Sequence, residues 1–271
     1  MIRFDVSRYP LCGAPEAMPA LPRRPHRLTH QAWALASRRF VRNDIPPILD
    51  RLEGCTRILD IGGGTGVVVR RIAEALGGCT TVEPDAASAS AIGEGRAGHR
   101  IRVLRGKAER LPIEEDSFDG VVSTWVLHYV DDVVRAVEEM IRVCDKRGSR
   151  IVIVQGAPDN EMIGLLNRNC CAAAGDAADH QGYLLATAAE VLFGRGFRSI
   201  EMTRVNVELR CEEADLEERI ASAAEVLQRF WYDRHPAAEL MKRRLAGELR
   251  AHFARKPSAI GNDGVLLVAR R

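Results

Sequence analysis

A glycine-rich loop is the clearest sign of chemistry in the sequence. It reads Asp60-Ile61-Gly62-Gly63-Gly64-Thr65-Gly66 and joins a short apolar segment, expected as a strand, to an amphipathic helix over 67–76. Glycine permits positive φ angles and lets a ligand touch the backbone. The loop therefore predicts a bound small molecule at the point where the strand meets the helix.

An acidic residue stands at the distance that a nucleoside site requires. Glu83 comes 21 residues after Gly62, at the end of the expected strand over 79–83. An acidic side chain at this place accepts two hydrogen bonds from ribose hydroxyls. A glycine triplet alone is weak evidence, but the strand, loop, helix and acid together favour a ligand that contains ribose.

The spacing of the glycines separates the possible ligands. The dinucleotide pattern G-x-G-x-x-G would put its third glycine at Val67, where a side chain would crowd the pyrophosphate, so a nicotinamide oxidoreductase is a weaker alternative. A phosphate-binding P-loop is excluded because no Gly-Lys-Ser/Thr follows.

The spacing that is present resembles motif I of the class I S-adenosylmethionine-dependent methyltransferases, with Asp60 ahead of Gly62-x-Gly64-x-Gly66. Segments 106–112, 116–119 and 125–130 are similar to the small-molecule branch related to the quinone-biosynthesis enzymes (methyltransferase type 11). The resemblance covers about residues 45 to 155 and is only architectural beyond them. It implies S-adenosyl-L-methionine as cofactor and S-adenosyl-L-homocysteine as product.

The resemblance also implies a set of cofactor-binding residues. They are Asp60, Gly62, Gly63, Gly64, Gly66, Glu83, Pro84, Ala108, Glu109, Thr124 and Trp125. The family often has an acidic residue where this chain has Lys107, and a lysine cannot accept a hydrogen bond from the adenine amino group. Either Glu109 or backbone groups take over that role, or adenine is bound more weakly.

His128 is the candidate catalytic residue. Methyl transfer from a sulfonium mainly needs alignment and exclusion of water, and it needs a base only if the acceptor loses a proton. His128 follows the expected strand over 118–124, where ligands bind in such sheets, and imidazole titrates near neutral pH. The alternative is that His128 packs or hydrogen-bonds beneath the cofactor.

A second set of residues could contact an acceptor. They are Trp33, Tyr129, Gln155, Phe230 and Trp231, with Phe40 and Tyr232 beside them. Aromatic residues make up only 5% of the chain, so this clustering indicates an aromatic lid over an apolar acceptor. Aromatic residues at helical spacing are more often core, and that alternative stays open.

Strands alternating with helices predict an α/β fold, with a parallel sheet covered on both faces. Strands are expected at 57–61, 79–83, 101–104, 118–124, 151–154, 199–209 and 264–269, and helices at 29–41, 67–76, 86–94, 133–143, 161–173, 187–193 and 212–253. The family implies a Rossmann-like, mostly parallel seven-stranded sheet whose last strand is antiparallel, plus a helical cap.

The domain boundaries follow from this pattern. An N-terminal arm and cap helix are expected over 1–45, the methyltransferase core over 46–211, a helical insertion over 212–258 and the final strand over 259–271. Five prolines in the first 27 residues prevent a long helix in the arm.

The composition narrows the function classes. The chain has 271 residues and a net charge of +2, so no global field attracts nucleic acid. Seven cysteines without a CxxC pair, and no apolar run long enough to span a membrane, predict a cytoplasmic protein without a metal site. We expect a monomer or homodimer acting on a small metabolite through an O, N, C or S acceptor. The alternatives are a cofactor-binding protein without catalysis and a protein or RNA methyltransferase.

Overall fold

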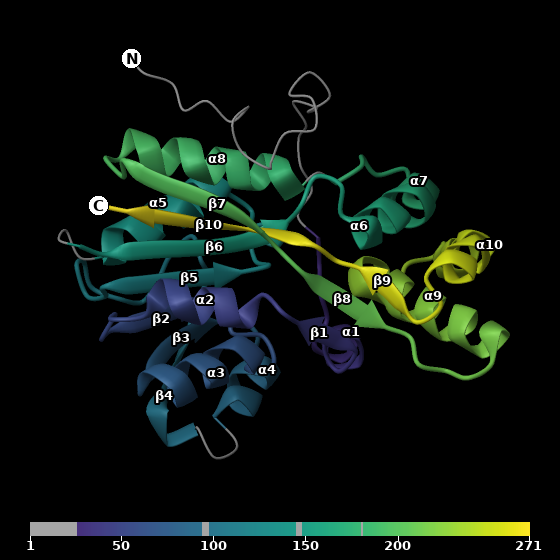
Figure 1. The fold of residues 1–271 in the computed structure, drawn as a ribbon, viewed down its shortest axis with the longest axis horizontal. Coiled ribbons are helices and arrows are strands. Elements are labelled where there is room, and N and C mark those ends of the chain that lie inside the picture. The colour runs from purple at the N-terminus through teal and green to yellow at the C-terminus, as the bar shows by residue number, and fades with distance from the viewer. Residues whose placement is uncertain (1–25, 94–97, 145–147, 180) are drawn as a thin grey trace.

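The computed structural model describes residues 26–93, 98–144, 148–179 and 181–271 (Figure 1). Most of the predicted N-terminal arm lies outside the described residues. The largest element is a seven-stranded sheet with the order β4-β3-β2-β5-β6-β10-β7. Its strands are β2 (Ile58–Ile61), β3 (Cys79–Glu83), β4 (Ile101–Arg105), β5 (Gly120–Thr124), β6 (Arg150–Gly156), β7 (Ser199–Val205) and β10 (Gly264–Arg270).

The pairing of these strands confirms the predicted sheet. The strands from β4 to β6 run parallel to their neighbours, whereas β10 is antiparallel to both β6 and β7. Strands β2, β5 and β6 are buried almost throughout, because helices cover both faces of the sheet. This double burial is why their sequences are mostly apolar, without the alternation of a strand that is exposed on one face.

Two groups of helices cover the two faces. α5 (Val133–Val143) and α8 (Gln181–Gly194) pack with Val121, Ile151 and Leu267, whereas α2 (Ile45–Leu52) and α3 (Val67–Leu76) pack with the alternate strand residues Val122, Val152 and Leu266. α4 (Ala86–Ile92) contributes Ile92 to the second group. Successive side chains of a strand point to opposite faces of the sheet, so neighbouring residues belong to the hydrophobic cores on opposite sides.

A separate cap lies beyond the carboxyl ends of the parallel strands (Figure 1). It contains α1 (His30–Ser37), α6 (Glu161–Leu166), a π-helical turn (Asn167–Cys171), α7 (Ala172–Ala174), α9 (Leu216–Tyr232) and α10 (Ala238–Arg255). It also holds a three-stranded antiparallel sheet of β1 (Phe40–Arg42), β8 (Val207–Arg210) and β9 (Ala259–Gly261). Leu166, Leu227 and Leu249 lie in the core of this cap.

Three sequence-based boundaries need correction in the cap. The helix expected over 29–41 ends at Ser37, and Phe40–Arg42 is a strand. The long strand expected over 199–209 is two strands, because β7 pairs with β10 in the large sheet and β8 pairs with β1 and β9 in the small one. The helical segment expected over 212–253 is two helices, and the connection holds Arg234 at φ 62° and Pro236.

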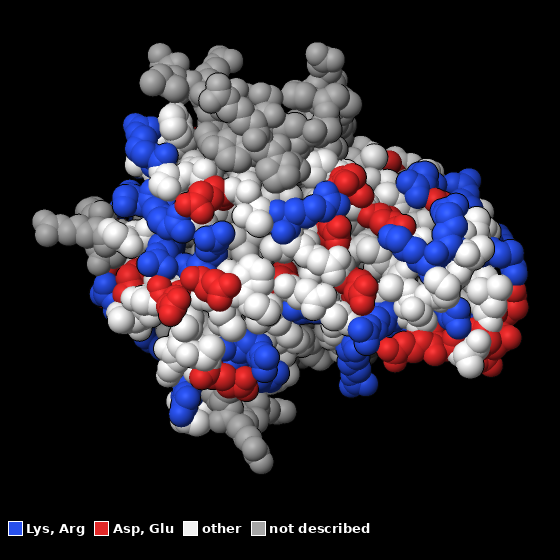
Figure 2. Space-filling view, viewed as in Figure 1, with Lys and Arg blue, Asp and Glu red and all other residues white. Residues whose placement is uncertain are grey.

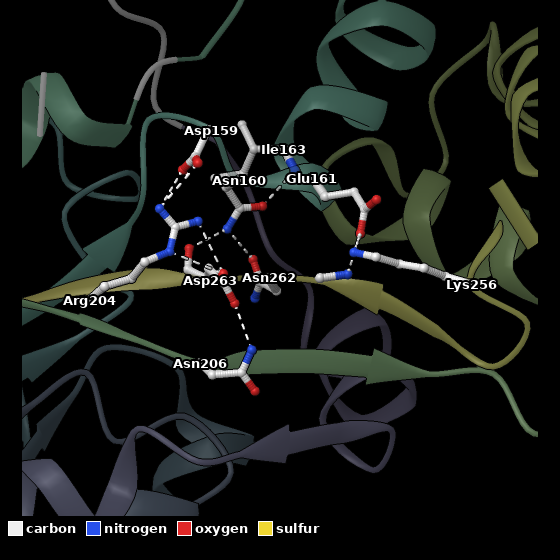
Figure 3. Close-up of polar contacts among 10 residues, drawn as sticks. Asp159, Asn160, Glu161, Ile163, Arg204, Asn206, Lys256, Asn262 and Asp263 are labelled. Carbon is white, nitrogen blue, oxygen red and sulfur yellow. Dashed lines mark hydrogen bonds and ion pairs between the residues drawn. The ribbon is translucent and has the colours of Figure 1, made fainter. Parts of the chain in front are cut away.

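A polar junction holds the large sheet to the cap (Figure 3). Arg204 on β7 contacts the carboxylates of Asp159 at 2.8 Å and Asp263 at 3.0 Å. Asn206 donates to the other oxygen of Asp263 at 2.7 Å. These contacts join the ends of β6, β7 and β10 where the chain passes from one sheet to the other.

Two buried amides complete this junction. The side chain of Asn160 donates to Asn262 Oδ1 at 2.8 Å and to the Asp263 carbonyl at 2.7 Å, while its oxygen accepts from Ile163 N and caps α6. Asn262 and Ile163 also line the apolar cavity described below. The junction therefore fixes one wall of that cavity.

Candidate functional site

A cavity of about 300 Å³ lies between the carboxyl ends of β2, β3 and β5 and the cap. Loops that follow these strands line one side, and α1, α9 and the residues before α1 line the other. Predicted cofactor residues that line it are Gly62, Gly63, Gly64, Glu83, Pro84, Ala108, Glu109, Thr124 and Trp125. The structure thus brings together residues that are spread over more than 60 positions of the chain.

The backbone of the glycine loop leaves no room for side chains at two positions. Gly62 has φ +83°, and an added Cβ would lie 2.4 Å from Cγ2 of Val126. Gly64 has φ +53°, and an added Cβ would lie 2.9 Å from the indole nitrogen of Trp33. Both positions combine a left-handed backbone with a close neighbour. Glycine fits both requirements, because it has no Cβ and adopts positive φ angles without a steric penalty.

Asp60 and Gly66 do not line the cavity. Asp60 is 1% exposed and lies behind Gly63, where its Oδ2 accepts a hydrogen bond from the Thr81 hydroxyl at 2.9 Å. Burial raises the pKa of Asp60 to about 7. Gly66 is the N-cap of α3. Asp60 was expected among the cofactor-binding residues, but its buried position behind the loop supports a role in holding the loop.

Glu83 is positioned by two backbone donors. Its Oε2 accepts from Gly64 N at 2.9 Å and its Oε1 accepts from Asp85 N at 2.9 Å. Burial raises the pKa of Glu83, although these hydrogen bonds oppose the shift. A carboxylate has about four lone-pair sites, so both oxygens keep acceptor capacity for hydroxyl groups.

The expected adenine side is more exposed. Ala108 is buried, and Oε1 of Glu109 accepts from Asp131 N at 2.6 Å. Lys107 extends toward solvent with 70% of its side chain exposed, and its ammonium group lies 3.4 Å from the Asp131 carboxylate. Asp131 lines the cavity and was missed by sequence reasoning, because the motif pointed only to the position of Lys107.

Trp125 has a strained backbone directly after β5. Its φ is 59°, which is uncommon for a bulky residue and costs roughly 1–3 kcal/mol. The indole Nε1 donates to Asp44 at 3.1 Å, and Arg42 holds this buried carboxylate with two hydrogen bonds of 2.7 and 2.9 Å. The cap strand β1 therefore supports Trp125, a link that no local pattern in the sequence indicates.

The position of Gln155 differs from its predicted place at the acceptor. It is fully buried behind the cavity wall. Its Oε1 accepts from Leu127 N at 3.2 Å, and its Nε2 contacts His128 Nδ1 at 2.7 Å and Gln181 Oε1 at 2.6 Å. Gln181 Oε1 also accepts from Gly156 N at 3.0 Å.

This amide chain sets the tautomer of His128. The N–H of Leu127 donates to Gln155 and the N–H of Gly156 donates to Gln181, and each of them needs an oxygen as acceptor. These two contacts therefore fix which end of each side-chain amide is the oxygen and which is the nitrogen. Nε2 of Gln155 therefore donates to His128 Nδ1, and a neutral His128 carries its proton on Nε2. His128 lines the cavity in this form, which supports a donor role rather than the predicted base role.

Aromatic side chains form the cap side of the cavity. The rings of Trp33, Phe40 and Phe230 lie about 6 Å apart, and Trp231 and Tyr129 also line the space. Burial raises the pKa of Tyr129, so its hydroxyl stays protonated. Trp33 of α1 and Phe230 of α9, two residues of the expected lid, therefore lie together at the cavity, whereas Tyr232 does not line it.

Two polar atoms beside the glycine loop fit a bound polar ligand. The Trp33 indole nitrogen and the Thr65 hydroxyl are buried and have no hydrogen-bond partner among the described residues. Both residues line the cavity. Buried polar atoms are normally satisfied, and a ligand bound in the cavity would supply the partners of these two.

Sequence reasoning missed three polar residues at the cap side: His26, Asp179 and Gln181. His26 and Gln181 line the cavity, and Asp179 lies against His26. They come from segments with no motif, before α1 and at the start of α8. No local pattern in the sequence marks these residues, because they come close to His128 only in the folded protein.

Comparison with known proteins agrees with this geometry. Residues 59–152 match the family model of the methyltransferase domain. The chain is 30% identical over 119 residues to the methyltransferase YcgJ of Bacillus subtilis (41% of this chain, 47% of that protein). It is 31% identical over 145 residues to a demethylmenaquinone methyltransferase of Mycobacterium sp. strain KMS (53% and 60%). The chain spans about half the length of the curated relatives it matches.

Solved structures share the fold over most of the chain. The crystal structure of YcgJ aligns with a TM-score of 0.58 and 18% identity, covering 85% of this chain and 99% of that one. An S-adenosylmethionine-dependent methyltransferase from Thermotoga maritima aligns with a TM-score of 0.53 and 17% identity (89% and 95%). Residues 59–152 are therefore similar to the methyltransferase domain, and the chain shares the fold of these solved structures.

Proposed function

We propose that the protein transfers a methyl group from S-adenosyl-L-methionine to a small-molecule acceptor. The observation that supports this proposal most strongly is one continuous cavity with one polar wall and one aromatic wall. The glycine loop and Glu83 form a polar wall, and Trp33, Phe230 and Trp231 form an aromatic wall. A site of this form holds a nucleoside cofactor and an apolar acceptor side by side.

The polar wall suits the cofactor. Gly62 and Gly64 let it approach the backbone, Glu83 accepts from the ribose hydroxyls, and Trp33 and Thr65 offer the buried donors described above. The cofactor, when bound, supplies an electrophilic methyl group on a positively charged sulfur. The chain's own part is to align the acceptor with that methyl group and to exclude water.

The aromatic wall favours a planar, apolar acceptor such as an aromatic or quinone-like metabolite. Flat side chains around a cavity bind flat ligands through stacking and apolar burial. The Mycobacterium relative is named for its action on demethylmenaquinone, which is an acceptor of this kind. His128 would donate its Nε2 proton to an oxygen of such an acceptor.

The surface charge supports a small acceptor rather than a nucleic acid. On the face shown in Figure 2, Lys and Arg side chains are interspersed with Asp and Glu. Several of them form ion pairs, as Arg204 does with Asp159 and Asp263. A nucleic-acid site would need a continuous basic surface to neutralise phosphates.

Two further properties of the described residues bear on the proposal. None of their helices is both long and apolar enough to cross a membrane. Within the same residues, His, Cys, Asp and Glu do not gather in groups of three or more that could hold a metal ion.

Calorimetric titration with S-adenosylmethionine, S-adenosylhomocysteine and NAD tests the cofactor. We expect the two adenosyl ligands to bind with dissociation constants in about the micromolar range, near −8 kcal/mol, and NAD not to bind. Absence of binding by both adenosyl ligands, also after addition of planar aromatic acceptors, would overturn the proposal. Binding of NAD alone would favour an oxidoreductase.

Replacement of Glu83 by Ala tests the ribose assignment. We expect binding of S-adenosylhomocysteine to weaken by about 10- to 100-fold, because a charged acceptor of two hydroxyl donors is lost, with a cost of roughly 1.5–3 kcal/mol. Glu74→Ala is the control, since Glu74 is an exposed residue of α3 away from the cavity. Equal affinities for the two variants would show that another group binds the ribose.

A further inference from the structure

His26 enters the cavity from the residues before α1. Its backbone N–H donates to the His128 carbonyl at 3.1 Å, which fixes the segment against the loop after β5. Its ring stacks on Trp231, with the ring centres 3.7 Å apart and the planes within 4° of parallel. His26 is therefore a positioned imidazole in the cap wall of the cavity.

A buried carboxylate lies next to this imidazole. Oδ2 of Asp179 is 3.7 Å from Nε2 of His26, and the two side chains are 5% and 12% exposed. This oxygen has no hydrogen-bond partner among the described residues. A buried negative charge is costly unless a cation or a donor faces it, and the His26 ring is placed to be that partner.

The groups around Asp179 come from several elements. His26, His128 and Gln181 face it with charge or hydrogen bonds, and Tyr129 and Cys171 lie close enough to be affected by its charge. Burial raises the pKa of Asp179, but the neighbouring imidazoles of His26 and His128 and the side chain of Gln181 outweigh burial and lower it. Asp179 is thus ionised at neutral pH.

The two histidines differ in whether the Nδ1 lone pair is left to accept a proton. Nδ1 of His128 already accepts a hydrogen bond from Gln155, so its Nε2 carries a proton. Nε2 of His26 faces the carboxylate of Asp179, which favours the proton on that nitrogen and leaves the lone pair on Nδ1. An aspartate that holds an imidazole in one tautomer and stabilises the imidazolium is the arrangement of a general base.

We propose that His26, held by Asp179, takes the hydroxyl proton of a planar acceptor bound in the cavity beside the His26 ring. The acceptor's O–H bond breaks, its electron pair stays on oxygen, and the proton bonds to Nδ1 of His26. The imidazolium charge is then balanced by the Asp179 carboxylate. His26 is the catalytic residue and Asp179 is a positioning residue. The inference rests on the proposed function, because it names the base for that reaction.

A coloured phenol tests the proton transfer directly. The probe is 4-nitrophenol, whose anion absorbs in the visible, and 4-nitroanisole is the matched ligand that has no proton to give. Both are titrated into the protein with and without S-adenosylhomocysteine, at a pH where the free phenol is mostly protonated. We expect both ligands to bind the native protein, and we expect bound 4-nitrophenol to show the spectrum of its anion.

Three variants separate the base from the stacking surface. His26→Phe keeps a ring on Trp231 but has no basic nitrogen, so 4-nitroanisole should bind as before. The anion spectrum should be lost, and 4-nitrophenol should bind about 10-fold or more weakly, the scale of a charge-assisted hydrogen bond. Asp179→Asn should reduce the anion signal in the same direction, and Asp179→Glu should restore part of it.

Three results would overturn the inference. One is an unchanged anion spectrum in His26→Phe. Another is loss of the spectrum only in His128→Asn, which would return the base role to His128. The third is failure of both nitro compounds to bind, since the aromatic wall would then not accept a planar ring. A native protein that binds neither S-adenosylhomocysteine nor S-adenosylmethionine refutes the proposed function separately, because the probe titrations are also made without cofactor.

Discussion

Replacement of Gly64 by Val is expected to abolish cofactor binding while the protein still folds. The valine Cβ would lie 2.9 Å from the Trp33 indole nitrogen, and its two methyl groups would extend into the space at the glycine loop. We expect the dissociation constant for S-adenosylhomocysteine to rise by about 100-fold or more, which is at least roughly 2.7 kcal/mol. Calorimetry measures this loss, and circular dichroism confirms the fold.

Gly77→Val is the matched control for this prediction. Gly77 also has a positive φ, +93°, but nothing lies within 4 Å of an added Cβ, and it ends α3 far from the cavity. Both variants suffer the strain of a left-handed backbone, roughly 1–2 kcal/mol for a residue with a Cβ. Native-like affinity of Gly64→Val, or an equal loss in Gly77→Val, would contradict the placement of the cofactor at Gly64.

Replacement of Asp60 by Asn is expected to change how stability depends on pH. The pKa of Asp60 is raised from 3.8 to about 7 because the carboxyl is buried, so ionisation is costly only in the folded state. The native protein should therefore lose stability as the pH rises from about 4 to about 7, and Asn cannot ionise. A shift of about three units corresponds to roughly 4 kcal/mol at most.

The measurement is the free energy of unfolding in urea at several pH values for both proteins. Relative to the native protein, Asp60→Asn should become more stable as the pH rises through this window, and the difference should be constant above it. Asp119→Asn is the control, because its pKa is lowered, so its effect should not vary between about pH 5 and 8. A pH-independent effect at Asp60 would show that its carboxyl ionises normally.

The large sheet was predictable because its signals are local. The ends of the helix over Val67–Leu76 and the strand over Cys79–Glu83 agree with the expected positions. Apolar strands of four to seven residues, separated by amphipathic helices, have one stable arrangement, namely a parallel sheet with both faces covered. The antiparallel last strand came from the family resemblance and agrees with the pairing of β10.

The cap was less predictable because its pairings are distant. Phe40 pairs with Leu209, and Leu209 pairs with Ile260. A three-residue strand such as β1 has too little periodicity to be distinguished from the end of a helix. The alternation over 199–209 likewise continues through Asn206, although the chain changes sheets there, because the alternation records exposure and not the partner strand.

The sequence by itself determined the glycine-loop side of the cavity, where we propose that the cofactor binds. Gly62, Gly64 and Glu83 belong to one strand–helix–strand unit, so their spacing specifies their geometry. Only the tertiary structure decided the acceptor half. His26, Asp179 and Trp231 lie more than 50 residues apart from one another, and each contact depends on how the cap folds over the sheet. It also decided which nitrogen of His128 carries the proton, because Gln155 and Gln181, which no local pattern connects to that ring, set its tautomer.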